Sequence, residues 1–276
     1  MSAGVPNQNG TITPLMFPSG SWRLMGVHYA PSLQTKRGVA VLMCNQVGPD
    51  YGEYYKTARM LVGMLVARGF DCLRFDYTGW GDSQGGSEEG SVQQWLADIA
   101  SAEALLRQRS GCSKICLCGF GFGGLLAAAH AARCEAEALL LWESVVDGRS
   151  YCRTLRKNHS AWLRGSFAKA TKLDKKFQAM GFVAAADLER QMRRWRLTNL
   201  PLCRAHRVFA VVQEGSSDQA VIVEHLSRDG ISVKTCAPGD ALPLRPMRTA
   251  IAWLKEIALE AMALEAMALE GMAGDG

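Results

Sequence analysis

The clearest candidate for chemistry is the run GFGFGG, from Gly119 to Gly124. The apolar run ICLC precedes it and the small-residue run LLAAAHAA follows it, which predicts a strand, a sharp turn and a helix. A G-x-S-x-G turn in that context holds a nucleophilic serine in a strained conformation above a sheet. Here Gly121 stands at the serine position. Because glycine adopts a positive φ at little steric cost, this substitution keeps the turn and removes the nucleophile.

The same run also fits the dinucleotide-binding pattern G-x-G-x-x-G, through Gly119, Gly121 and Gly124. Glu143, at the end of a following strand, would be the acidic partner. That pattern belongs at the first strand of its fold, whereas this strand comes late in the chain. We therefore favour the nucleophile turn.

A hydrolytic serine also needs a carboxylate and a histidine. Asp218 follows the predicted strand 207–213, at the position of the acid, but it also begins a predicted helix. We favour the helix-capping role, because an acid without a histidine has no catalytic task. The loop expected to hold the base, residues 237–246, contains no histidine. Of the histidines elsewhere, His159 could reach a cleft from above, although packing is the simpler interpretation.

Two backbone N–H groups that would stabilise an oxyanion can survive the loss of the serine. One belongs to Phe122, directly after the nucleophile position, and the other to Asn45 or Gln46 in an earlier loop. Cys44, at the end of the strand before that loop, is the thiol that could replace the nucleophile. No base is predicted near it, so we regard this alternative as the weaker one.

The loop RFDYTGWGDSQG, from Arg74 to Gly85, resembles a second pattern, D-x-R-G-x-G-x-S, that follows an early strand in many hydrolases. Its glycines, aspartates and serine fix the loop conformation. We expect a structural role, and nothing in the sequence supports Ser83 as a substitute nucleophile. The matching residues are Asp76, Gly79, Gly81, Asp82 and Ser83.

Together these motifs resemble α/β hydrolases of the serine-aminopeptidase-like, exosortase-A-system-associated type. The resemblance covers about residues 14–164 and includes PLMFPSGSWRLMGVHYAP, QWLADIASA and LLLWESVVDGRSYCRTLR. It implies an α/β-hydrolase fold and hydrolysis of esters, thioesters or peptides, and some members of this type also lack the serine. The oxyanion role carries over to Phe122, and the acid position to Asp218.

Strands and helices alternate along most of the chain, which predicts a mostly parallel central sheet flanked by helices. We expect strands at 22–29, 38–44, 71–77, 114–118, 138–142, 207–213 and 231–236, and helices at 54–68, 91–108, 122–132, 220–228 and 248–258. Residues 149–200 show only helical spacing, which predicts a helical lid inserted into a core formed by 1–148 and 201–276. Near-repeats of ALEAM over 258–272 predict a low-complexity extension of the last helix, with an oligomer contact as the alternative.

The predicted lid carries an unusual charge. Residues 151–200 hold 12 Lys or Arg against three acidic residues, a net charge of +9, whereas the whole chain has +5. Arg190, Arg193 and Arg194 would share one helical face. We predict that this surface binds an anionic partner such as an acidic carrier protein, with a merely solubilising surface as the alternative.

Composition excludes several classes of protein. No apolar run is long enough to cross a membrane, and the N-terminal residues do not have the pattern of a secretory signal. Nine cysteines without such a signal favour reduced thiols and a cytoplasmic location. The spacing of Cys112, Cys116 and Cys118 is not that of a zinc site. We expect no metal, cofactor or nucleic acid.

The sequence therefore predicts a hydrolase fold with a degraded triad in a bacterial biosynthetic pathway. Its role would be to bind an acyl or peptide-like ligand, including an anionic one, or to act as a scaffold. The alternative is an active hydrolase or acyltransferase that uses a non-standard nucleophile on an ester, thioester or amide.

Overall fold

The computed structural model describes residues 5–7, 10–165, 177–180, 182–184, 187–201, 203–227, 231–238 and 243–273. Its main feature is a nine-stranded sheet in the order β1-β2-β3-β5-β4-β6-β7-β10-β11. In this order, β1, β2, β3 and β5 pair antiparallel with one another. The strands that follow in the sheet, from β5 through β4, β6, β7 and β10 to β11, pair parallel. The strands are β1 (Val5–Asn7), β2 (Gly10–Ser19), β3 (Trp22–Pro31), β4 (Val39–Cys44), β5 (Asp71–Phe75), β6 (Lys114–Phe120), β7 (Ala138–Trp142), β10 (Arg207–Val211) and β11 (Ser232–Cys236).

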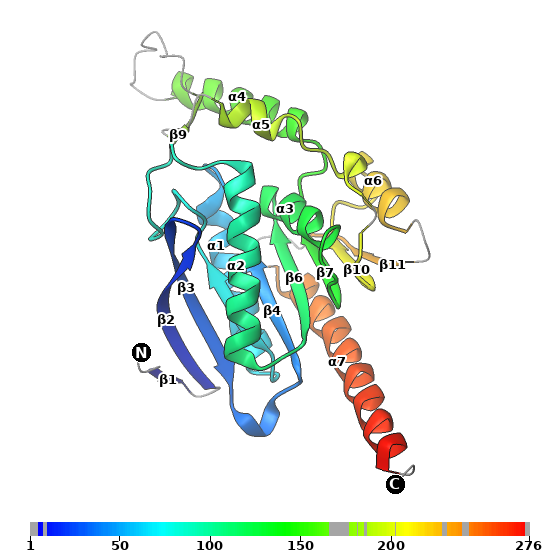
Figure 1. Ribbon diagram of the computed structural model, residues 1–276. Coiled ribbons are helices and arrows are strands. Elements are labelled where there is room, and N and C mark those ends of the chain that lie inside the picture. The colour runs from blue at the N-terminus through cyan, green and yellow to red at the C-terminus, as the bar shows by residue number, and fades with distance from the viewer. Residues whose placement is uncertain are drawn as a thin grey trace.

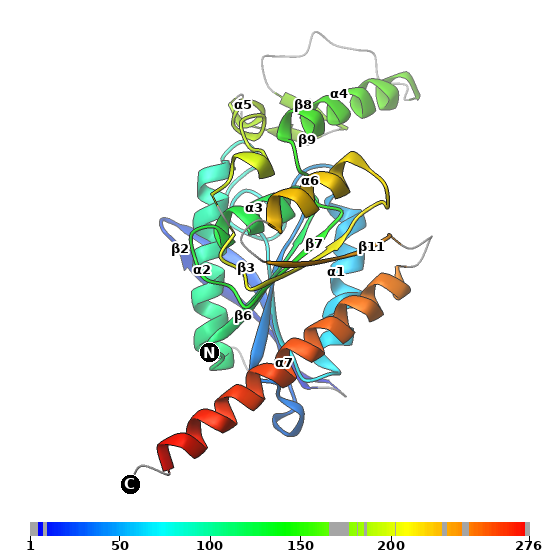
Figure 2. The same cartoon turned by 90° about the vertical axis from the view of Figure 1, so that its right-hand side faces the viewer.

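Helices cover both faces of this sheet (Figures 1 and 2). One face carries α2 and α3, and the other carries α1 and α7, whose C-terminal part extends past the sheet. The segment with α4 and α5 lies above the carboxyl ends of the parallel strands. The helices are α1 (Tyr51–Val66), α2 (Val92–Ser110), α3 (Phe122–Ala131), α4 (Gly148–Gly165), α5 (Leu188–Met192), α6 (Ser217–Leu226) and α7 (Leu244–Ala273). Within the described ranges, no helix is long and apolar enough to cross a bilayer.

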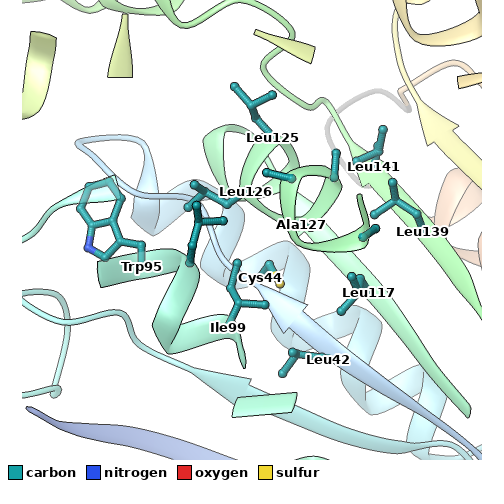
Figure 3. Packing of buried hydrophobic residues seen from close by; sticks show 14 of the residues in the cluster. Leu42, Cys44, Trp95, Ile99, Leu117, Leu125, Leu126, Ala127, Leu139 and Leu141 are labelled. Carbon is teal, nitrogen blue, oxygen red and sulfur yellow. The ribbon is translucent and has the colours of Figure 1, made fainter. Parts of the chain in front are cut away.

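Strand β4 shows why the central strands are apolar throughout. All six of its residues are buried, and successive side chains point to opposite faces of the sheet. Leu42 and Cys44 pack into the cluster beneath α2 and α3, while Val41 and Met43 pack into the cluster beneath α1 and α7. Figure 3 shows the first cluster, in which Leu42 and Cys44 lie among side chains from α2, α3 and the neighbouring strands.

The predicted parallel sheet with flanking helices is confirmed, and ALEAM residues 258–272 lie within α7, as expected. The strand β2 was missed because Pro14 and Pro18 interrupt its pattern. Both prolines are tolerated because β2 pairs with β3 along its whole length, whereas β1 covers its outer edge only at residues 10–12.

The prediction of helices alone over 149–200 is wrong. Residues Gly148–Gly165 form α4 as expected, but β8 (Phe177–Ala179) and β9 (Phe182–Ala184) form an antiparallel hairpin. The hairpin reverses direction at Met180, which has a φ of 48°. Near the end of the segment, the only further α-helix among the described residues is α5, which has five residues. Parts of the segment, at 166–176, 181 and 185–186, lie outside the described residues.

A buried carboxylate in α2 ties three parts of the fold together. Asp98 is fully buried and accepts hydrogen bonds from the Ser19 hydroxyl at 2.7 Å and the Thr78 backbone N–H at 2.8 Å. The Thr78 hydroxyl, at 3.1 Å, and the Gln94 side chain, at 2.8 Å, also donate to it. Asp98 thereby joins α2 to the end of β2 and to the loop after β5.

We expect the substitution Asp98→Ala to lower the free energy of unfolding by about 3 kcal/mol, because it leaves several buried donors without an acceptor. Urea denaturation followed by circular dichroism would measure the loss. Gln108→Ala, at an exposed position of the same helix, is the control and should change the unfolding free energy by less than about 0.5 kcal/mol. Equal stabilities of the two variants would contradict the role of Asp98.

Candidate functional site

The turn between β6 and α3 has the geometry predicted for a nucleophile turn. Gly121 lies between the two elements with a φ of 52° and a ψ of −122°, a region that L side chains rarely adopt. The flanking glycines allow close packing, since a Cβ on Gly123 would lie 2.0 Å from the carbonyl oxygen of Asn45. The expected strand, turn and helix are therefore all present, with a glycine at the position of the nucleophile.

The side chain of Gln46 fills the space beside this turn. Its Oε1 accepts a hydrogen bond of 2.6 Å from the Phe122 N–H. Its Nε2 donates to the Tyr151 hydroxyl at 2.8 Å, and that hydroxyl donates to the carbonyl of Val47 at 3.1 Å. The Tyr151 ring stacks on Phe122 with 5.8 Å between ring centroids. A Cβ on Gly121 would lie only 2.3 Å from Oε1 of Gln46.

This arrangement places the predicted oxyanion residues differently from expectation. Phe122 N–H lies where it was expected, but it is already engaged by a carboxamide oxygen of the chain itself. Gln46 is thus an acceptor at this site, through its side chain. Asn45 is buried, and its Nδ2 donates to the carbonyl of Phe75 at 3.0 Å, so its side chain holds the loop to β5.

A cavity of about 280 Å³ opens above Gly121. Carboxylates from separate loops and helices dominate its polar lining, and Arg196 pairs with one of them, Asp147, at 3.0 Å. Burial raises the pKa of Glu143, and burial together with nearby Glu53 raises that of Asp50. The lining comprises Gln46, Asp50, Tyr54, Gly121, Glu143, Ser144, Val145, Val146, Asp147, Ser150, Tyr151, Thr154 and Asp218.

Asp218 therefore reaches the site, but as part of an acidic wall. It lies in the first turn of α6, where a negative charge is favourable. The residue that caps this helix is Ser216, whose hydroxyl accepts from the Gln219 N–H at 3.1 Å, so the expected capping role of Asp218 is wrong. Burial raises the pKa of Asp218, and the nearby Asp147 raises it further.

None of the five histidines lines this cavity. His159 is buried in α4, where its Nδ1 accepts from the Met180 N–H at 2.9 Å and its ring stacks on Trp162. The packing interpretation of His159 accounts for these contacts. His28 pairs with Asp71, and His130 with Glu103, both within the body of the fold.

Cys44 is a poor substitute nucleophile. Its side chain is fully buried in the core (Figure 3) and does not line the cavity. Burial raises the pKa of the Cys44 thiol far above its ordinary value, as does the charge of Glu103. A thiol becomes nucleophilic as the thiolate, so this position has the opposite of the required environment.

The loop after β5 has the structural role predicted for it. The Ser83 hydroxyl donates to the carbonyl of Asp76 at 2.5 Å and accepts from the Met25 N–H at 2.9 Å. The Asp76 carboxylate accepts from the Tyr51 hydroxyl at 2.6 Å and from the Asp82 N–H at 3.1 Å. These bonds hold the loop against β3 and α1 and leave Ser83 engaged on both sides.

The three arginines of the predicted docking surface do not share a helical face, because α5 ends at Met192. Arg190 forms an ion pair with Asp187, and Arg193 lies 3.5 Å from Glu189. Arg194 instead lines a separate groove beside α2.

Sequence reasoning missed most of the cavity lining. Glu143, Asp147 and Tyr151 belong to the stretch LLLWESVVDGRSY, whose unusual sequence was the available signal. Asp50 directly precedes α1 and Tyr54 lies in its first turn, and neither carried a distinctive pattern. Among the described residues, no group of three His, Cys, Asp or Glu side chains is arranged to hold a metal ion.

Solved structures with the same overall arrangement include several α/β hydrolases. The DcsB complex with its substrate analogue aligns at 16% identity and a TM-score of 0.62 over 90% of this chain and 98% of its own. Est1E from Butyrivibrio proteoclasticus with bound ferulic acid aligns at 16% identity and a TM-score of 0.65 over 90% of this chain and 99% of its own. XC6422 from Xanthomonas campestris, described as an α/β serine hydrolase without a lid, aligns at 14% identity and a TM-score of 0.58 over 94% of this chain and 97% of its own. No curated protein sequence matches the chain.

The sheet order and these structural matches show that this protein has the α/β-hydrolase fold. The family model for serine aminopeptidase, S33, matches residues 41–215, which is well over half of the chain. The chain belongs to that family.

The contact between Gly121 and Gln46 predicts that substitutions at the two positions are coupled. Gly121→Ala should destabilise the protein by more than the roughly 1 kcal/mol expected for a Cβ at positive φ, because the new atom collides with the carboxamide. In a Gln46→Ala background the extra cost should disappear, which gives a coupling energy of at least about 1 kcal/mol in a double-mutant cycle.

Gly111→Ala is the matched control for this cycle. Gly111 has a φ of 70°, but a Cβ there meets no atom within 4 Å. Its cost should therefore be the same with and without Gln46. Additive effects of Gly121→Ala and Gln46→Ala would show that Gln46 does not occupy the space beside the turn.

Proposed function

We propose that this protein is a non-hydrolytic member of its family and binds a peptide-like ligand in the cavity above Gly121. The observation that carries the proposal is the Gln46 carboxamide. Its oxygen accepts a hydrogen bond from the Phe122 N–H. In a hydrolase of this fold, that N–H would donate to the substrate oxyanion. The same side chain lies where the nucleophile's Cβ would be.

The groups needed for proton transfer support the same proposal. Asp218 lines the cavity, but no histidine does, so a hydroxyl or water there has no imidazole base beside it. The carboxylates with raised pKa values, Asp50, Glu143 and Asp218, are the remaining titratable candidates for a base. A base here has little to activate, because the site has no nucleophilic side chain at position 121 and the Phe122 N–H is already occupied.

The lining of the cavity defines the ligand chemistry. Carboxylates of Asp50, Glu143, Asp147 and Asp218 offer acceptors, so a ligand with N–H donors or an amine fits better than an anion. The amides and amino terminus of a short peptide supply such groups. An acyl ligand that ends in a carboxylate would meet repulsion here.

The first expected result concerns activity. Purified protein should hydrolyse p-nitrophenyl acetate and short acyl thioesters at the solvent rate, because loss of triad members removes a factor of about 10⁴–10⁶ in turnover. Gly121→Ser alone should not restore activity, since no base is in reach of the new hydroxyl. Cys44→Ala should leave the rate of hydrolysis unchanged, because this thiol is buried.

Spectrophotometric assays of the wild type and both variants would provide the test. The alternative of an active hydrolase or acyltransferase predicts turnover that follows the protein through purification. Turnover well above the solvent rate, lost in the cavity-filling variant Thr154→Trp, would refute the non-hydrolytic proposal.

The second expected result concerns binding. Alanyl-alanine amide, which carries an amine and amide N–H groups, should bind in calorimetric titrations, whereas N-acetyl-alanyl-alanine, which is anionic, should not. Thr154→Trp should abolish binding by filling the cavity, and Arg153→Trp, one position away and exposed but outside the lining, should not. Equal affinity for both peptides, or binding unaffected by Thr154→Trp, would contradict the proposed ligand site.

A further inference from the structure

A groove of about 650 Å³ lies on the side of the molecule formed by α2, the end of α3 and the segment after α5. It shares no lining residue with the cavity above Gly121. Its volume is within the range of about 300–1,000 Å³ found for small-molecule sites. The lining comprises Val92, Gln93, Leu96, Ala97, Ala100, His130, Arg133, Cys134, Gln191, Arg194 and Trp195.

The floor of the groove is apolar. Leu96 and Val92 are buried beneath it, and Ala97 and Ala100 present small exposed side chains along α2. The half-buried Trp195 contributes an aromatic wall. An aliphatic chain placed against these side chains would remove apolar surface from water.

The charged groups of the groove are basic. Arg133 and Arg194 are exposed, and neither forms an ion pair in the part of the chain that the structure describes. Glu103, whose carboxylate lies 2.5 Å from the groove residue His130, also forms an ion pair with Arg107 at 2.7 Å. Two guanidinium groups beside an apolar floor match the charge of a phosphate dianion on an apolar body.

The geometry of the chain supports the same polarity. The groove begins at the N-terminus of α2, where the helix dipole is positive. The Gln191 Oε1 accepts from the Val92 N–H at 3.0 Å, which fixes the segment that carries Arg194 against α2. A bond between the core and the inserted segment thus anchors the chain three residues before Arg194 beside the groove.

We propose that this groove binds a phosphate monoester with a short apolar chain, with Arg133 and Arg194 contacting the phosphate and the α2 surface contacting the chain. This binding is separate from the ligand proposed above Gly121. It also narrows the basic surface of residues 149–200, which was predicted to bind an anionic partner, to one arginine of that segment acting together with one arginine of the core.

Cys134 provides a built-in probe, because it lines the groove and is the exposed cysteine among the described residues. Saturating octyl phosphate should slow alkylation of Cys134 by the neutral reagent iodoacetamide at least fivefold, as followed by peptide mass spectrometry. Octanol, which has no charge, should leave the rate within twofold. Inorganic phosphate and octanoate should each bind at least tenfold more weakly than octyl phosphate, as measured by calorimetry.

Variants separate the groove from a general basic surface. Arg133→Gln with Arg194→Gln should weaken octyl phosphate binding at least tenfold, and Ala100→Trp should block it while both arginines remain. The control pair Arg190→Gln and Arg193→Gln, outside the groove, should change affinity by less than twofold, as should Thr154→Trp in the other cavity. Circular dichroism confirms that each variant is folded.

Three results would overturn the proposal. They are absence of protection of Cys134, equal affinity for octyl phosphate and octanoate, and equal loss of affinity in the two double-arginine variants. Equally tight binding of inorganic phosphate would overturn the role of the apolar floor. None of these results bears on peptide binding or hydrolysis at the other cavity.

Discussion

The turn at residue 121 constrains everything above the sheet. Gly121, with a φ of 52°, joins β6 directly to α3, and Gly123 packs so closely against the Asn45 carbonyl that a side chain there would collide with it. Any residue at 121 therefore projects into the space at the carboxyl ends of the parallel strands, where ligands bind in sheets of this kind. A glycine there satisfies the backbone but leaves that space without a side chain of its own.

Gln46 fills this space and so changes what the cavity can do. If the space beside Gly121 were empty, the Phe122 N–H would lose its hydrogen-bond partner once a ligand excluded water. The Gln46 carboxamide oxygen supplies that partner at 2.6 Å. The Tyr151 hydroxyl then satisfies the carboxamide nitrogen at 2.8 Å. A serine restored at position 121 alone would meet this network, so recovery of hydrolysis would require removal of Gln46 as well as a histidine base.

Strong local patterns made most of the fold predictable. The apolar run of β6, the glycines after it and the small residues of α3 locate the turn because each signal depends on near neighbours in the sequence. The role of Gln46 could not be predicted, since it depends on contacts with Phe122 and Tyr151, 76 and 105 positions away. The hairpin at Met180 and strand β2 were missed because neither has a continuous apolar pattern, and the prolines of β2 argue against a strand.

The distribution of charge shows why a net charge is a poor guide to a binding surface. Residues 151–200 carry a net +9, yet in the described part of that segment Arg190 pairs with Asp187, and Arg156 and Arg193 pair with Glu189. Arg196 reaches across to Asp147 in the acidic wall of the cavity above Gly121. An arginine paired with a carboxylate contributes little attraction to a distant anion, because the fields of the two opposite charges nearly cancel beyond their own separation. Salt screens what remains over about a Debye length. What attracts an anion is an arginine without such a partner beside a surface that can hold the rest of the ligand. Among the residues that the structure describes, Arg194 and Arg133 meet that condition together although they are distant in the sequence.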